Sequence, residues 1–248
     1  MALIKVGSIN NFAVTAKEPV IKKNPFLKGI RTFAALNELS GEFTPDLFEL
    51  ITSTDQRGVA IKSIKLTEGF EGFLQKYLNP TNEIYFVAWA WDFSGEPVNL
   101  YPGSNFNAQD VIIPMKVGNI REFIGQGINL FPKRRIKGGI AIRIQLWESD
   151  QNVRNFGKAM TETADAIKKS DLNNLLTLIS MATGVTGVTI NLIKEASIEL
   201  AKVIGIILQS NGDDYVDFFE GYYASDTAWT IEDESYQGNS SVLTLSKY

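Results

Sequence analysis

The side chains that could do chemistry in this sequence are mainly carboxylates, because the 248 residues include no histidine and no cysteine. Without histidine the chain lacks the usual general base of serine and cysteine hydrolases, and without cysteine it lacks thiolate nucleophiles and cysteine-bound zinc. Oxygen ligands remain, so calcium and magnesium are the metals that the composition allows. No phosphate-binding glycine loop, nucleophile elbow or dinucleotide fingerprint is present. We therefore favour a non-catalytic protein and leave carboxylate-based hydrolysis open as the enzymatic alternative.

Carboxylates gather at two places along the chain. The candidate metal ligands are Glu148 and Asp150 at the end of one strand pattern, and Asp213, Asp214 and Asp217 after a long helical pattern. Asp213 and Asp217 could face a common cation, or two carboxylates of this group could serve as the acid and base of a glycosidase. An aspartate-rich turn between a helix and a strand is the alternative without chemistry.

One predicted loop concentrates positive charge in Lys133, Arg134, Arg135 and Lys137. Each cation near an anionic lipid surface adds about 1 kcal/mol to binding. The loop is therefore either simply solvated or a contact with an anionic membrane. The whole chain has a formal net charge of -4, so nucleic acid is not an expected partner.

The strands that would position these groups are clearest at 83–92 and 136–147. In the first, Trp89 and Trp91 point to the same face, because side chains alternate along a strand. This row is either part of a core or, if it faces solvent, a platform for stacking on sugar rings. In the second strand, isoleucines alternate with polar residues such as Arg143.

Weaker patterns complete the expected set of elements. Further strands are expected at 59–66, 97–101, 110–117, 120–124, 214–223, 226–231 and 241–246, and short helices near 44–51 and 70–78. Within the first of these strands the apolar positions slip by one residue between Ile61 and Ile64. Turn residues that recur at short intervals between strands favour an antiparallel sandwich over a parallel sheet.

A helical pattern occupies residues 151–210 and bends near 184–187. Its uncharged run at 172–193 approaches the roughly 20 residues that span a bilayer, but asparagine and threonine make it only moderately hydrophobic. The second arm has a wide apolar face, which includes Leu192, Leu200 and Ile204. Such a face needs a covering surface. The candidates are the protein's own sandwich, a second copy of the chain, a membrane or another protein.

The sequence therefore predicts an α+β protein, in which an antiparallel β-sandwich carries an inserted long α-helical hairpin. Residues 1–55 are expected to form an extended segment that packs on the sandwich. Residues 56–150 and 211–248 are expected to form the sandwich itself, and residues 151–210 the hairpin.

Two segments resemble the C2 domain family, whose members bind calcium and lipid. Asn82-Glu-Ile-Tyr-Phe-Val-Ala-Trp89 is similar to the strand after the family's first calcium loop, and Ile140-Ala-Ile-Arg-Ile-Gln-Leu-Trp-Glu-Ser-Asp150 to the strand that ends at its third. The resemblance covers about residues 55–160. It implies that Glu148 and Asp150 form the acidic pair of a calcium site, with Glu148 standing where the family favours aspartate.

These patterns favour a protein that acts at an anionic membrane or on a partner protein through its hairpin, as a bacterial effector or toxin-like protein would. The alternative is a carbohydrate- or protein-binding module whose hairpin is purely structural. Calcium is the only cofactor implied, and a homo-oligomer is compatible with the apolar hairpin. The N-terminal segment has no continuous apolar region or cleavage site. We therefore expect synthesis in the cytoplasm, and any export by a route that needs no cleaved signal.

Overall fold

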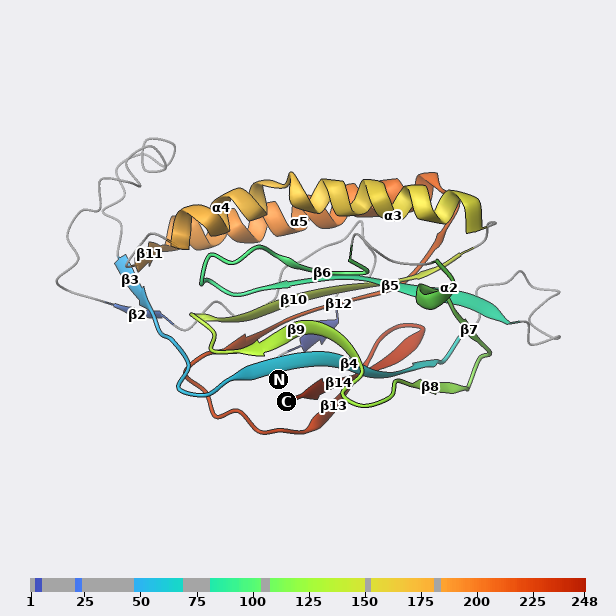
Figure 1. Ribbon diagram of the computed structural model, residues 1–248, viewed down its shortest axis with the longest axis horizontal. Helices are drawn as coiled ribbons and strands as arrows, with labels where there is room; N and C mark the ends of the chain where they lie inside the picture. Colours follow the sequence, from blue (N-terminus) through green and yellow to red (C-terminus); the bar gives the residue numbers. More distant parts are fainter. Residues whose placement is uncertain are drawn as a thin grey trace.

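The computed structural model of the chain describes residues 3–5, 21–23, 47–68, 81–103, 108–149, 153–180 and 184–248. These residues form three layers, with helices on one side of two antiparallel sheets (Figure 1). The predicted α+β sandwich with a helical hairpin is confirmed at this level. The helix expected at 70–78 lies outside the described residues, as does Asp150.

Strands and helices follow the chain in a simple order. The strands are β1 (Leu3–Lys5), β2 (Ile21–Lys23), β3 (Leu47–Leu50), β4 (Arg57–Leu66), β5 (Asn82–Trp91), β6 (Asn99–Tyr101), β7 (Ile113–Met115), β8 (Ile120–Glu122), β9 (Ile128–Arg134), β10 (Gly139–Glu148), β11 (Gly184–Thr186), β12 (Asp214–Ala224), β13 (Asp233–Gln237) and β14 (Ser241–Lys247). The helices are α2 (Ala108–Val111), α3 (Val153–Lys168), α4 (Asp171–Ser180) and α5 (Gly187–Ser210).

The inner sheet lies between the helices and the other large sheet (Figure 1). Its strand order is β1-β12-β10-β5-β6, and β7 also pairs with β5. The outer sheet has the order β13-β14-β4-β8, and β9 also pairs with β4. A small third sheet, β11-β3-β2, joins the bend of the helical hairpin to the N-terminal part of the chain.

Side-chain alternation along β5 and β10 creates two cores, one on each face of the inner sheet. Trp89 and Trp91 belong to the core beneath the helices, whereas Phe86 belongs to the core between the sheets. In β10, the isoleucines face the outer sheet. The period-two predictions for both strands are confirmed.

The slip in the apolar pattern of β4 corresponds to a β-bulge. Ile61 and Ile64 are both fully buried between the sheets although they are three positions apart. The register with β14 shifts between Thr244 and Leu245, opposite this part of β4. A bulge inserts one residue and so restores the inward face after the slip.

The helical layer, residues 153–210, is an insertion between two neighbouring strands. It follows β10 and precedes β12, and the last residue of β10, Glu148, is the cross-strand partner of the first residue of β12, Asp214. The first arm is divided into α3 and α4, and the hydroxyl of Ser170 and the amide of Asn173 both donate to the Ile167 carbonyl at this break. Both ends of the insertion therefore meet at one end of the inner sheet.

Three local predictions are wrong. The segment near 44–51 contains strand β3 rather than a helix, because pairing with β2 and β11 determines its conformation. Residues 226–231 form a loop, whose Thr227 carbonyl accepts a hydrogen bond from Arg57. The basic segment at 131–137 is not entirely a loop, since β9 extends to Arg134.

Candidate functional site

The helical layer covers the tryptophan face of the inner sheet. Trp89 is 1% exposed and Trp91 is 2% exposed. Neither ring can serve as a sugar-stacking platform while the helices are in place, so that interpretation of the two residues is corrected. The ring of Trp89 lies 6.5 Å from that of Phe218, and the ring of Tyr85 meets Phe156 of α3 edge-on at 4.7 Å.

The apolar face of α5 supplies the other side of this core. Leu200 and Ile204 are buried, and Leu192 is half-buried. Leu200 and Ile204, which we assigned to a membrane or partner surface, therefore lie in the core that the helices share with the inner sheet. The outward side of the layer exposes Leu178, and Ile206 is 66% exposed.

A buried ion pair lies in the inner sheet beneath the helices. Arg143 of β10 and Glu220 of β12 are cross-strand partners, and Nε of the arginine is 3.0 Å from a carboxylate oxygen of the glutamate. The Arg143 guanidinium also lies 5.4 Å from the centre of the Trp91 ring. Burial lowers the pKa of Arg143, and the charge of Glu220 opposes this shift.

Hydrogen bonds connect the sheet to the helices at only some of the buried polar groups. Gln145 donates to the Ala201 carbonyl of α5 at 3.0 Å and accepts a hydrogen bond from the Trp147 indole at 3.0 Å. Among the described residues, other buried polar atoms of this region have no hydrogen-bond partner: Nε1 of Trp89, Nε1 of Trp91, Oγ1 of Thr163 and Oγ of Ser197. Each such atom costs about 1–3 kcal/mol, because it has lost its water without gaining a partner.

Asp213 joins the end of the helical layer to the inner sheet. Its carboxylate accepts a hydrogen bond from the Tyr85 hydroxyl at 2.8 Å and one from the Asn211 amide at 3.0 Å. Burial raises the pKa of Asp213, although these hydrogen bonds and one from Ser149 oppose the shift. Burial and the charge of Asp213 also raise the pKa of Tyr85, so the phenol stays protonated and continues to donate.

The structure does not bring Asp213 and Asp217 together. Asp213 contacts Tyr85 on the helix side of the inner sheet, whereas Asp217 accepts hydrogen bonds from the turn between β13 and β14. The donors to Asp217 are the backbone amides of Asn239 and Ser240 and the hydroxyl of Ser241. Its carboxylate therefore stabilises a turn of the outer sheet.

Two further predicted carboxylate ligands, Glu148 and Asp214, lie at the two ends of the insertion. Glu148 is buried and its cross-strand partner Asp214 is exposed. Within the described ranges, no three acidic side chains lie close enough to hold a metal ion. Glu148 and Asp214 thus lie at one end of the inner sheet, and the described residues supply no third acidic ligand beside them.

The basic segment divides into structural and exposed cations. Arg134 forms an ion pair of 2.9 Å with buried Asp92 and lies over the Phe131 ring, so it helps to hold the fold. The backbone amide of Lys137 donates to the same carboxylate. Lys133 and Arg135 are exposed. Two of the four predicted cations are therefore directed to solvent.

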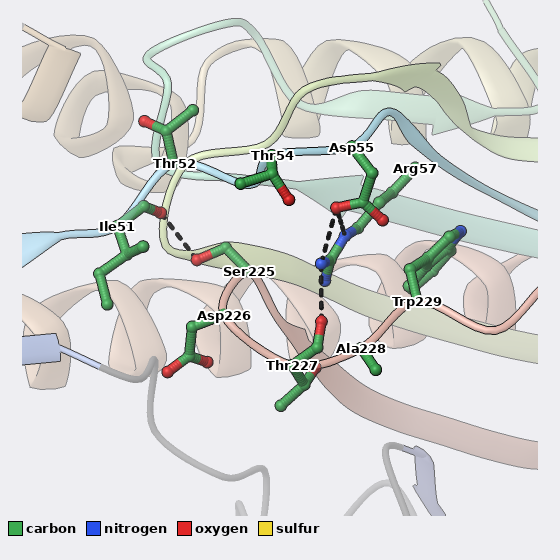
Figure 2. Close-up of a pocket in the computed structure, with 10 residues that line it drawn as sticks. All are labelled: Ile51, Thr52, Thr54, Asp55, Arg57, Ser225, Asp226, Thr227, Ala228 and Trp229. Atoms are coloured by element: carbon green, nitrogen blue, oxygen red, sulfur yellow. Dashed lines mark hydrogen bonds and ion pairs between the residues drawn. The ribbon is translucent and has the colours of Figure 1, made fainter.

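A hollow of about 410 Å³ lies at the end of the sandwich where residues 51–57 meet residues 225–229. Figure 2 shows Asp55, Arg57 and Trp229 along one side of it. Arg57 is buried and donates to Asp55, to the Ala224 carbonyl at 2.6 Å and to the Thr227 carbonyl at 2.7 Å.

The charges at the hollow are largely satisfied within the protein. The Trp229 ring is contacted by Arg57, at 5.2 Å from its centre, and by Lys247, at 5.6 Å. Burial alone would raise the pKa of Asp55, but the hydrogen bonds and charge of Arg57 lower it. Asp226 is exposed at the rim. Sequence reasoning missed this hollow, because its lining comes from segments far apart in the chain.

The buried ion pair was also missed, although the sequence holds a signal for it. Arg143 lies between Ile142 and Ile144, and Glu220 follows Phe218 and Phe219, so opposite charges stand within apolar stretches of two strands, which favours their pairing.

A comparison with protein-family models, with curated proteins and with solved structures finds no match for this chain. In the part of the chain that the structure describes, no helix is both long and apolar enough to cross a bilayer.

Proposed function

We propose that this is a non-catalytic protein that acts at an anionic membrane surface through its helical layer. In this proposal the layer leaves the inner sheet and lays its apolar face, including Leu200 and Ile204, on the lipid. An amphipathic helix binds a bilayer in this way when its apolar face enters the boundary between headgroups and acyl chains.

The single observation that carries the proposal is the attachment of the layer. The insertion leaves the inner sheet after Glu148 and returns at its cross-strand partner Asp214. The pairing of β10 with β12 does not depend on the position of the helices, so the layer could move away as one body without breaking the sheet. At the bend of the hairpin, β11 pairs with β3, the strand that precedes β4 of the outer sheet.

Unpartnered polar atoms in the helical layer and in the sheet beneath it support the same proposal. The indole nitrogens of Trp89 and Trp91 and the hydroxyls of Thr163 and Ser197 are buried without partners among the described residues. When the layer moves away, these groups regain water, which offsets part of the cost of exposing the apolar core.

An engineered disulfide across β3 and β11 tests the proposal. Phe48 and Val185 are register partners in an antiparallel pair, and the Cα atoms of such partners lie about 4.5–5.5 Å apart, which a disulfide spans. The chain has no native cysteine, so Phe48→Cys/Val185→Cys forms one defined bridge. We expect the reduced protein to release dye from phosphatidylserine-containing vesicles and the oxidised protein not to.

A matched control places the bridge within the outer sheet. Ser235 and Thr244 are register partners in β13 and β14, far along the chain from the hairpin bend. Oxidation of Ser235→Cys/Thr244→Cys should leave vesicle leakage unchanged. Equal leakage from both oxidised variants would contradict the proposal.

A second candidate function is binding of a small polar ligand, such as a sugar, in the hollow at residues 51–57 and 225–229. The specific support is a half-buried Trp229 beside hydroxyl groups and the exposed carboxylate of Asp226. In this alternative the helical layer is structural. Binding to a glycan array that is lost in Asp226→Ala, with no vesicle leakage, would favour it over the membrane proposal.

Calcium binding and a C2-like relationship are also proposals. They are supported by the two-sheet sandwich and by Glu148 at the end of β10, where the resembling segment ends. Titration calorimetry with calcium on the intact protein and on Glu148→Gln tests the site. Calcium binding to the intact protein that Glu148→Gln weakens would support it, and no binding heat would contradict it.

A further inference from the structure

The segment between β7 and β9, which contains β8, exposes two isoleucines to solvent. Ile124 is 100% exposed and Ile120 is 60% exposed. We refer to residues 116–127 as the isoleucine tip. Other exposed large apolar residues of the described chain lie on the helices or, like Ile231, in a separate loop. Ile120 in β8 and Ile124 just after it therefore form a distinct exposed apolar feature.

The outer sheet holds this tip in a fixed conformation. The Phe123 amide donates to the Lys62 carbonyl at 2.9 Å, and the Lys62 ammonium donates to the Gly125 carbonyl at 2.6 Å. Gly127 has a φ of 98°, and a Cβ there would stand 2.1 Å from the Ile61 carbonyl oxygen. Only glycine permits this close approach. The isoleucines are therefore presented by a paired strand and the braced segment after it, which lowers the ordering cost of binding.

Positive charge surrounds the exposed isoleucines. Lys65 is the cross-strand partner of Ile120, and Lys116 and Arg121 are exposed within the tip. With Lys62 this makes four cations against two nearby carboxylates, Glu68 and Glu122. Among the described residues none of the four cations is in an ion pair, whereas cations on the helices, such as Lys202, have carboxylate partners. In a chain with a net charge of -4, this local excess favours an anionic surface.

We propose that the isoleucine tip is a docking site for an anionic lipid bilayer. Ile120 and Ile124 enter the boundary of the acyl chains, while Lys65, Lys116 and Arg121 meet the headgroups. The tip belongs to the outer sheet, and the helices cover the opposite face of the inner sheet (Figure 1). Docking by the tip is thus independent of any release of the helical layer.

Flotation with vesicles tests the proposal on the intact chain. We expect the protein to bind phosphatidylcholine vesicles that contain phosphatidylserine and to bind pure phosphatidylcholine far more weakly. Replacing one isoleucine of the tip by serine should weaken binding about tenfold or more, from the transfer free energy of a buried isoleucine. Ile231→Ser, a change at an exposed isoleucine outside the tip, should have no effect.

Charge variants separate the electrostatic part of the interaction. Lys116→Gln and Arg121→Gln should each weaken binding to phosphatidylserine vesicles about fivefold, and the loss should shrink at high salt. No binding to either vesicle, equal binding to both, or unchanged binding by Ile120→Ser/Ile124→Ser would overturn the proposal. A protein partner in place of lipid would appear as one of these results.

The locked hairpin variant distinguishes this inference from the proposed function. Oxidised Phe48→Cys/Val185→Cys should still float with anionic vesicles, because its isoleucine tip is unchanged. If the oxidised variant floats with the vesicles and also releases their dye, docking by the isoleucine tip is supported and action through release of the helical layer is contradicted. If it does not float although the reduced form does, the isoleucine tip is not the docking site.

Discussion

The two faces of the inner sheet are both buried, but they are joined to their neighbours in different ways. Toward the outer sheet, Ile142 and Ile144 pack with apolar residues such as Leu243. Toward the helices, the same strand presents Arg143 and Gln145, and the indole nitrogens of Trp89 and Trp91 have no hydrogen-bond partner among the described residues. The first interface is almost purely apolar, whereas the second combines aromatic packing with uncompensated polar groups.

This difference indicates that the two interfaces differ in stability. The sheet–sheet interface gains from every buried atom, so it forms a stable base. The helix–sheet interface also buries much apolar surface, but part of that gain is lost to groups without partners. We therefore expect the helical layer to open at a lower free energy than the sandwich unfolds.

Removing the buried cation should have the largest effect. Arg143→Met leaves Glu220 charged and buried without its ion-pair partner, which should cost about 3–5 kcal/mol of unfolding free energy. Arg143→Met/Glu220→Leu should recover most of this loss. Urea unfolding measures both, and a cost below about 1 kcal/mol for the single variant would show that the ion pair matters little.

Cavity-forming substitutions on the two faces come next. Ile144 and Ile204 are both fully buried, and truncation of either to alanine should cost about 2–5 kcal/mol of global stability. Ile144→Ala should leave the opening free energy of α3–α5 unchanged, because the sandwich stays intact when the layer opens. Ile204→Ala should lower it. If both variants changed the amide hydrogen exchange of α3–α5 equally, the helical layer and the sandwich would open together.

Hydroxyl deletions should change stability in opposite directions on the two faces. Thr163→Val removes an unpartnered buried hydroxyl and should raise the unfolding free energy by about 1 kcal/mol. Ser241→Ala removes a hydroxyl that donates to Asp217 at 2.6 Å and should lower it by about 1–3 kcal/mol. Destabilisation by Thr163→Val would indicate that this hydroxyl has a partner after all.

The smallest expected effect is on the pH dependence of the unfolding free energy. Burial alone would raise the pKa of Glu234, but hydrogen bonds from Lys247 and Tyr236 hold it below its ordinary value of 4.5. Its contribution is therefore present above that value and is lost as pH falls through the lower folded pKa. Burial raises the pKa of Asp213 above 3.8, so its contribution has the opposite sign and stability is gained as pH falls.

These opposite signs give a direct comparison of two variants. Glu234→Gln should reduce the loss of stability in acid, whereas Asp213→Asn should stabilise the protein slightly at neutral pH and remove the gain in acid. Urea midpoints measured from neutral to acidic pH check both. The same slope in both variants would contradict the assignment of signs.

The alternation of side chains made much of the sandwich predictable from the sequence. It placed Trp89 and Phe86 on opposite faces of one strand and Ile144 and Arg143 on opposite faces of another, and the slip after Ile61 marked the bulge. Alternation does not tell whether the second face of a sheet meets water or another layer. Alternation alone therefore did not show whether Arg143 faces water or helices, and it left the tryptophan row open between a core and a sugar-stacking platform.

The candidate sites were less predictable because they depend on contacts between distant segments. Asp217 looked like a metal ligand by composition, yet it serves a turn of the chain more than twenty residues later. Residues 226–231 have the composition of a strand, but Arg57 holds the loop through the Thr227 carbonyl. One sequence does not show which distant segment Asp217 or the 226–231 loop contacts.

Native-state hydrogen exchange tests the central claim most directly. If the helical layer is a separable unit, the amides of α3–α5 should exchange through an opening whose free energy lies well below that of global unfolding. The central amides of β4, β5, β10 and β12 should exchange only at the global value. A single exchange free energy shared by the helices and the sheets would contradict the account.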